Sequence, residues 1–279
     1  MPMTDLTADT APLLVLAAGQ RCGSTLVQRL LSSHPRVRIW GEHAGQLRQV
    51  LTARQRLLRW SETGGMAGRS ELKSHGHQGF IANVMPERNH IDEAVLSFVE
   101  ALFAVPARDE GRPVWGFKEV RYGLPDVLLL RELFPALRVV LVVRDPRDVL
   151  RSLDEWENLG GWNRARTDES LRNWHRVAGS FVGSDTDEHL RSFILRVRYE
   201  DLIRFSQAWL VAIADHCRLD AGLLDGGVFE QRVHTAGARG RADRRLREWS
   251  ELPTSLRSLV DDEDLQMVAS TYGYDLSNS

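Results

Sequence analysis

Cysteine, lysine and long apolar runs are all scarce in this chain of 279 residues. Its two cysteines, Cys22 and Cys217, are too few for a disulfide framework, so the sequence predicts a protein of the reducing cytoplasm. No stretch approaches about eighteen consecutive apolar residues, which argues against a membrane span. Asp5 and Asp9 lie near the N-terminus without a basic region, which argues against a signal peptide, and we expect residues 1–10 to form a disordered leader.

An excess of charge of either sign is also absent, because 36 basic residues face 38 acidic ones and the net charge is −2. This balance gives no electrostatic reason to expect a nucleic acid or an anionic membrane as partner. The basic residues are nearly all arginine, and the only lysines are Lys73 and Lys118. Arginine suits bidentate phosphate recognition, but so broad a bias is more typical of genome composition than of one site. The sequence does not indicate an oligomeric state.

Short apolar runs alternate along the chain with apolar residues at helical spacing. The runs predict buried strands and the spacing predicts helices between them. This alternation predicts an α/β protein with a three-layer, P-loop-like fold, in which helices flank a central parallel sheet. At this length one domain over residues 11–279 is expected. The predicted strands are Leu13–Ala18, Val37–Trp40, Val114–Phe117, Leu137–Val143 and Phe193–Val197.

Residues 61–90 interrupt the pattern. They are rich in Gly, Ser, His and Asn and have weak periodicity, so we expect a long loop. A loop of that length inside a compact domain is often a lid or a binding segment. His75, His77 and His90 lie in it, but histidines in a polar loop are more often solvated than bound to zinc. No metal site is therefore predicted.

The segment that follows the first predicted strand, residues 19–25, has the features of an anion site. It reads Gly-Gln-Arg-Cys-Gly-Ser-Thr and leads into a helix, whose free N–H groups and positive dipole end attract anions. Gly23 lets the backbone approach a ligand closely, the two hydroxyl residues after it add donors, and Arg21 supplies charge. An ordinary strand-to-helix turn with Ser/Thr capping is the alternative interpretation.

This loop matches neither of the two common nucleotide-binding patterns. A Walker A loop needs glycine where Ala18 stands and lysine where Ser24 stands, and no dinucleotide fingerprint occurs here. Cys22 has two interpretations. Its place near a helix N-terminus could lower the pKa of the thiol and make it reactive, but we favour a small residue that acts through its backbone N–H.

A second candidate anion site follows the predicted strand Leu137–Val143. Arg144 stands at the carboxyl end of that strand, and Ser152 follows eight residues later, one to two turns inside the expected helix. The pair could close on one anion, with charge-assisted hydrogen bonds worth about 1.5–3 kcal/mol each. A surface ion-pair cluster with Asp145 and Asp148 is the alternative.

Taken together, these motifs resemble the sulfotransferase superfamily, and most closely its tyrosylprotein and bacterial carbohydrate branch. The resemblance implies transfer of a sulfuryl group from 3′-phosphoadenosine 5′-phosphosulfate (PAPS) to an acceptor hydroxyl, with 3′,5′-bisphosphoadenosine (PAP) as product and no metal. It is carried by residues 21–26, Ser33-His34-Pro35, Trp40-Gly41-Glu42, Gly116-Phe117-Lys118, Val143-Arg144-Asp145 with Ser152, Arg198-Tyr199-Glu200-Asp201-Leu202 and Gly273-Tyr274.

The resemblance implies a role for each of these residues. Glu42 would be the general base, with His43 as the alternative, and Arg21 and Lys118 would stabilise the leaving phosphate. Partial burial between Trp40 and the lid is expected to raise the pKa of Glu42 towards a useful value. The implied nucleotide-binding residues are Gln20, Arg21, Cys22, Gly23, Ser24, Thr25, Arg144, Ser152, Tyr199, Arg239 and Arg241.

The chain departs from the family pattern at several places. Gln20 and Cys22 replace the usual proline and serine of the first loop. The Arg-Lys-Gly loop that holds the 3′-phosphate in cytosolic members is absent, and residues 237–241 could replace it, with the choice between Arg239 and Arg241 open. Trp249 could stack on a flat group, although a buried aromatic without a ligand is the simpler interpretation.

Two other functions remain as alternatives. A P-loop kinase for a small molecule would need a lysine after Gly23 and an acidic magnesium ligand. A non-catalytic nucleotide-binding protein would have no need to keep Arg21, Glu42 and Lys118 together. The acceptor is left open between a small molecule or phenol, a carbohydrate, a lipid and a peptide tyrosine, and residues 61–90 are the expected lid and acceptor segment.

Overall fold

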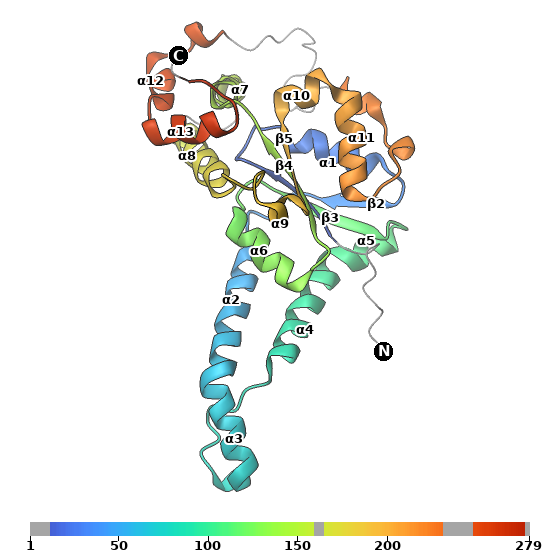
Figure 1. Cartoon of the computed structure of the whole chain (residues 1–279), viewed down its shortest axis with the longest axis vertical. Helices are drawn as coiled ribbons and strands as arrows, with labels where there is room; N and C mark the ends of the chain where they lie inside the picture. Colours follow the sequence, from blue (N-terminus) through green and yellow to red (C-terminus); the bar gives the residue numbers. More distant parts are fainter. Residues whose placement is uncertain (1–11, 159–164, 231–247, 277–279) are drawn as a thin grey trace.

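A five-stranded parallel sheet lies at the centre of the molecule (Figure 1). The computed structural model describes residues 12–158, 165–230 and 248–276. The strand order is β2-β3-β1-β4-β5, and helices cover the sheet, so the predicted α/β class is confirmed. The strands are β1 (Leu13–Ala17), β2 (Val37–Trp40), β3 (Val114–Glu119), β4 (Arg138–Val143) and β5 (Ile194–Arg198).

The two faces of the sheet are apolar because successive side chains of a buried strand point to opposite sides. Leu13 and Val15 of β1 belong to a cluster with α1 (Ser24–Ser33) and α11 (Ser206–Cys217). Leu14 and Leu16 belong to a larger cluster on the other face. Strands buried on both faces read as continuous apolar runs, which is why the sequence predicted them well.

The other helices connect the strands or close the chain, as the alternation of the sequence predicted. Near the C-terminal end of the described residues, a 3₁₀ turn lies between α12 and α13. These helices are α2 (Leu47–Trp60), α3 (Met66–His75), α4 (Arg88–Val99), α5 (Val105–Asp109), α6 (Leu124–Leu133), α7 (Pro146–Asn158), α8 (Ala165–Ser180), α9 (Glu188–Arg191), α10 (Tyr199–Arg204), α12 (Thr254–Arg257) and α13 (Glu263–Thr271).

The expected long loop over residues 61–90 is wrong, because much of this segment is helical. A π-helical turn, Ser61–Gly65, continues α2 and leads directly into α3. The chain then returns along α3, where a Cβ atom on Gly68 would lie only 2.7 Å from the backbone nitrogen of Val84. The small residues thus permit close packing rather than a loop. Residues 47–99, from α2 to α4, form an arm that projects from the body of the molecule (Figure 1).

Gly116 in β3 provides a test of how tightly the central strands pair. A Cβ atom at this position would lie 1.9 Å from the carbonyl oxygen of Leu13 in β1. We therefore expect Gly116→Ala to lower the free energy of unfolding by about 3 kcal/mol, the upper end for overpacking. Chemical denaturation measures the change. Gly41→Ala is the control, because open space surrounds Gly41, and its effect should stay within about 0.5 kcal/mol. Equal effects would contradict the strand register.

Candidate active site

The loop between β1 and α1 is built from residues with alternating backbone handedness. Gly19, Arg21 and Gly23 have φ angles of +87°, +64° and +96°. Such alternation is typical of concave loops whose successive N–H groups point towards an anion. Gly23 is the N-cap of α1, and no side chain caps this end of the helix. The first-turn N–H groups, those of Ser24 and Thr25 among them, therefore lack a side-chain acceptor at the carboxyl end of β1.

The loop after β4 is hydrogen-bonded to the loop after β1. Arg144, directly after β4, donates from Nη1 to the carbonyl oxygen of Arg21 at 3.0 Å. In return, Arg21 donates from Nε to Oγ of Ser152 in α7 at 2.9 Å. The Arg21 guanidinium also lies 5.1 Å from the ring centre of Trp156. The two predicted anion-binding segments therefore lie together at one edge of the sheet, as their sequence positions indicated.

Tyr199, the first residue of α10, packs against both loops. Its ring centre lies 4.4 Å from the guanidinium carbon of Arg144. A Cβ atom on Gly23 would lie 2.3 Å from Cδ2 of the same ring. Gly23 is thus required twice, by its positive φ and by the tyrosine against it. Tyr199, which the sequence predicted to bind the nucleotide, therefore lies beside both candidate anion-binding loops.

Positive charge is concentrated where these loops meet. Burial, and then the nearby Arg144, lower the pKa of Arg21 below its ordinary value. Within the described ranges, neither Arg21 nor Arg144 forms an ion pair with an acidic side chain. Nε of Arg144 is buried without a hydrogen-bond partner. Buried cations are normally paired, so this pair of arginines forms a candidate binding site for an anion.

Cys22 is buried within the same loop and is not activated. Its thiol donates to the carbonyl oxygen of Ala18 at 3.0 Å, and burial raises the pKa of Cys22 to about 12. Burial therefore opposes the formation of a reactive thiolate at this position. Oε1 of the neighbouring Gln20 is also buried.

A second group of charged residues lies at the carboxyl ends of β2 and β3. Glu42 follows β2, and its Oε1 accepts a hydrogen bond from Nζ of Lys118 at 2.5 Å. Its Oε2 accepts one from Nη1 of Arg121 at 2.9 Å. Burial raises the pKa of Glu42, but the bonds from the two cations outweigh this effect and hold the pKa below its ordinary value. The expected raised pKa of Glu42 is therefore wrong for the unliganded protein.

Glu119 anchors the loop that carries Glu42. Its carboxylate is fully buried and accepts hydrogen bonds from the backbone N–H of Gly45 at 2.7 Å and of Val120 at 2.9 Å. It also accepts one from Nη1 of Arg121 at 2.9 Å, so Arg121 joins Glu119 to Glu42. Sequence reasoning missed both roles. The available signal was the charged pair Lys118-Glu119 at the end of the apolar strand β3.

His43, the alternative base, is packed into an aromatic environment. Its ring centre lies 5.0 Å from that of Phe117 and 5.7 Å from that of Tyr122. Burial lowers its pKa, and its Nδ1 lies 3.7 Å from the Glu119 carboxylate. Glu42, rather than His43, is the group that contacts the Lys118 ammonium.

The loop that carries Arg144 is held in place by residues whose role the sequence did not predict. Trp174 of α8 donates from Nε1 to the carbonyl oxygen of Arg144 at 3.0 Å. The hydroxyl of Tyr274 donates to Glu200 at 2.8 Å, and Glu200 accepts the backbone N–H of Asp145 at 3.0 Å. Glu200 and Tyr274 stood in the matched motifs without a stated role. Nothing in the sequence pointed to Trp174.

Some predicted residues lie elsewhere. Arg239 and Arg241 fall outside the described residues. Trp249 is partly buried against the larger apolar cluster. Within the residues described, no group of three or more His, Cys, Asp or Glu side chains could hold a metal ion. In that same part of the chain, no helix is long and apolar enough to cross a membrane.

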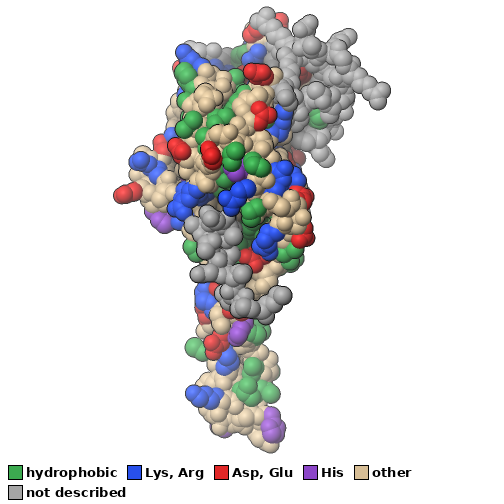
Figure 2. All heavy atoms as spheres, turned by 90° about the vertical axis from the view of Figure 1, so that its right-hand side faces the viewer, with side chains coloured by type: hydrophobic (Ala, Val, Ile, Leu, Met, Phe, Trp, Pro, Cys, Tyr) green, Lys and Arg blue, Asp and Glu red, His purple; other side chains and the backbone are tan. Residues whose placement is uncertain are grey.

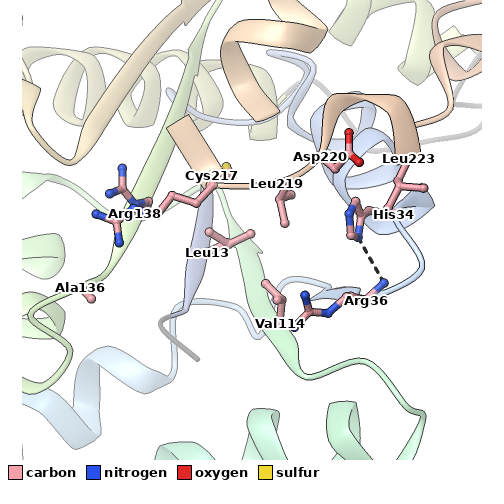
Figure 3. A pocket seen from close by; sticks show the side chains of 11 residues that line it. Leu13, His34, Arg36, Val114, Ala136, Arg138, Cys217, Leu219, Asp220 and Leu223 are labelled. Atoms are coloured by element: carbon pink, nitrogen blue, oxygen red, sulfur yellow. Dashed lines mark hydrogen bonds between the residues drawn. The ribbon is translucent and has the colours of Figure 1, made fainter. Parts of the chain in front are cut away.

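A cavity of about 300 Å³ lies at the opposite, amino-terminal edge of the sheet (Figure 3). Leu13, Val114 and Arg138 line it from the first residues of β1, β3 and β4. His34 accepts a hydrogen bond from the backbone N–H of Arg36 at its wall. None of the candidate catalytic or nucleotide-binding residues lines this cavity, so it is separate from the site described above.

Comparison with protein families and curated sequences points in one direction. A model described as Sulfotransferase family matches residues 12–222. Protein-tyrosine sulfotransferase 1 of Danio rerio is 23% identical over 201 residues, which are 71% of this chain and 51% of that protein. Protein-tyrosine sulfotransferase 2 of Gallus gallus is 26% identical over 204 residues, which are 72% and 50%. The chain spans about half the length of these curated relatives.

Solved structures show the same fold. The sulfotransferase domain of the Synechococcus PCC 7002 olefin synthase aligns with a TM-score of 0.54 and 19% identity, over 98% of both chains. The sulfotransferase domain from the curacin biosynthetic pathway aligns with a TM-score of 0.51 and 16% identity, over 95% of this chain and 98% of that domain.

The state of the two cysteines can be measured directly. Both are buried, and burial raises the pKa of Cys22 and of Cys217 to about 12. A colorimetric thiol reagent at pH 8 should therefore detect no thiol in the folded protein and both after denaturation. A thiol that reacts quickly in the folded protein, and that a nucleotide protects, would contradict the structural role of Cys22.

Proposed function

Because this chain belongs to the Sulfotransferase family, we propose that it transfers a sulfuryl group from PAPS to an acceptor hydroxyl. The observation that carries the proposal is the hydrogen bond from Arg144 to the carbonyl oxygen of Arg21, which joins two anion-binding segments. One nucleotide with phosphates at both ends of its ribose suits such a pair. A mononucleotide phosphorylated only at its 5′ end would leave one segment without an anion.

The two ends of the donor would have separate partners. The 5′-phosphosulfate would lie on the N–H groups of residues 19–25 and the N-terminus of α1. The 3′-phosphate would lie between Arg144 and Ser152, with Tyr199 beside it. Neither arginine forms an ion pair in the described ranges, and this supports the assignment, since an anion would compensate their charge. Arg239 or Arg241 would add to the 3′-phosphate site.

The chemistry requires a base on one side of the sulfur and positive charge on the other. Glu42 would take the proton of the acceptor hydroxyl while its oxygen bonds to sulfur. The bond from sulfur to the phosphate oxygen breaks, and Lys118 and Arg21 would stabilise the charge that PAP carries away. Lys118 touches Glu42 already, so the base and the electrophile are neighbours.

The bond between Lys118 and Glu42 suggests how donor binding prepares the base. In the unliganded protein, Lys118 helps to hold the pKa of Glu42 low. A phosphosulfate within reach of the Lys118 ammonium would compete with Glu42 for it. Burial of Glu42 would then act with less opposition, so its pKa would rise and its carboxylate would become a stronger base.

The acceptor class and the location stay proposals. A tyrosine side chain is one candidate, because two relatives are protein-tyrosine sulfotransferases, but a carbohydrate, lipid or small-molecule hydroxyl would suit the same chemistry. A cytoplasmic location agrees with two unpaired, buried cysteines. A P-loop kinase is less favoured, since Ser24 stands where its lysine would be needed.

Measuring nucleotide binding tests whether the two loops joined by Arg144 form one nucleotide site. By isothermal titration calorimetry without magnesium, PAP should bind, and Arg144→Ala should weaken binding about 10–100-fold, as expected for a charge-assisted hydrogen bond. Arg147→Ala is the matched control. Arg147 pairs with Asp145 nearby, so this substitution should change PAP binding little.

Glu42→Gln should bind PAP normally and lack transfer activity. Magnesium-dependent ATP binding tighter than that of PAP would instead favour the kinase.

The role of Lys118 can be tested by pH dependence. The depressed pKa of Glu42 keeps the carboxylate ionised, and the base available, to lower pH than an ordinary glutamate allows. Lys118→Ala removes a bond that lowers this pKa, so the acid limb of kcat/KM should move to higher pH, and kcat should fall about 10²–10³-fold.

Lys73→Ala is the control for this experiment. Lys73 is the only other lysine and is exposed in α3, so both the pH profile and kcat should match those of the original protein. An unchanged acid limb in Lys118→Ala would mean that the observed bond does not govern the basicity of Glu42.

A further inference from the structure

Most of the large apolar side chains that are exposed in the described part of the chain lie on the arm or directly after it. Ten of the seventeen large apolar side chains that are exposed in the described ranges lie between residues 57 and 105, a segment of 49 residues in a chain of 279. Trp60 is 50% exposed, Met66 59% and Phe80 70%. Figure 2 shows hydrophobic side chains on the arm, interspersed with charges of both signs. Concentrations of this kind mark interaction surfaces.

Helix α2 carries apolar residues on a second face. Its buried face, formed by Leu47, Leu51, Arg54 and Leu58, packs towards α4 and α6. Ala53, Leu57 and Trp60 recur at intervals of four and three residues on the other side and are exposed. A helix that packs one apolar stripe and exposes a second one can contact neighbours on two sides.

A second exposed stripe begins on α4, the returning helix of the arm, and continues past the arm. Phe98, Leu102 and Val105 recur at intervals of four and three along α4, the π-helical turn Glu100–Ala104 and α5, and each is 40–49% exposed. Helix α2 runs outwards and α4 returns, so Leu57 and Trp60 lie towards the outer end and this second stripe lies close to the body (Figure 1).

We propose that the arm is the surface through which two copies of this chain associate. The arms would lie antiparallel across a two-fold axis, with Leu57 and Trp60 of each copy on Phe98 and Leu102 of the other. A two-fold axis requires this reciprocity, since residue i then contacts j and j contacts i. The outer end of each arm, residues 61–90, would lie beside the body of the partner. The association does not depend on the reaction proposed above.

The size of the exposed stripes fits such a dimer. Leu57, Trp60, Met66, Phe98, Leu102 and Val105 are each about half exposed. At about 100 Å² each they offer about 600 Å² per copy, or about 1,200 Å² in a pair, where specific interfaces begin.

The charge of the arm also fits a second copy. Over residues 47–99, seven lysines and arginines face five aspartates and glutamates, so the charges nearly balance and repulsion between two identical arms is weak. A membrane surface or a strongly charged partner would favour an excess of one sign.

Sedimentation velocity over a concentration series tests the association. The full chain should dimerise at about 10 µM, and Trp60→Glu and Phe98→Glu should each raise the dissociation constant at least tenfold. Met267→Glu is the control, because Met267 is 62% exposed on α13, outside the arm. The dimer of this variant should have an unchanged dissociation constant. Circular dichroism verifies that each variant is folded. A chain that stays monomeric up to about 100 µM would overturn the proposal.

Disulfide trapping tests the antiparallel arrangement. The native cysteines are buried, so they give little background. Tagged Leu57→Cys and untagged Leu102→Cys, mixed and oxidised, should yield mainly the mixed dimer. Leu57→Cys alone should remain largely uncrosslinked. Efficient crosslinking of Leu57→Cys to itself would mean that the outer ends meet each other, and would overturn the arrangement.

Discussion

The hydrogen bond between Arg144 and the carbonyl oxygen of Arg21 is the constraint on which the candidate site depends. It fixes the loop after β4 to the loop after β1, and those strands are neighbours in the sheet. Trp174 holds the backbone of Arg144 from one side, and Tyr199 stacks on its guanidinium from another. The bond thereby brings the two arginines together at the ends of two adjacent strands.

A second constraint is the burial of Glu119. A carboxylate without solvent must be fully hydrogen-bonded, and Glu119 meets this requirement with two backbone N–H groups and Arg121. The chain between β2 and α2 is thereby held to the end of β3. This is what places Glu42 against Lys118, and the proposed base is close to the proposed electrophile for the same reason.

The sequence predicted the parts of the molecule that depend on local pattern. The apolar runs of β1 and β4 and the position of Arg144 after β4 are local features, and parallel pairing then brings the carboxyl ends of the strands to one edge. The loop predicted for residues 61–90 is wrong because glycine is typical of irregular chain but also permits close packing between regular segments. Gly68 is instead small because Val84 packs against it.

Features that depend on distant partners were not predictable. The direction of the Glu42 pKa shift depends on two cations that come from the end of the neighbouring strand and the residues after it. Burial alone would have given the opposite sign. Trp174 lies 30 residues after Arg144 in the sequence, and only the packing of α8 brings the two together.

The most direct measurement of the central claim is a crystal structure with PAP bound. The account predicts the 5′-phosphate at the N–H groups of Gly23, Ser24 and Thr25, and the 3′-phosphate within hydrogen-bond distance of Arg144 and Ser152. Both phosphates on one loop, or a nucleotide bound away from the Arg21–Arg144 junction, would contradict it.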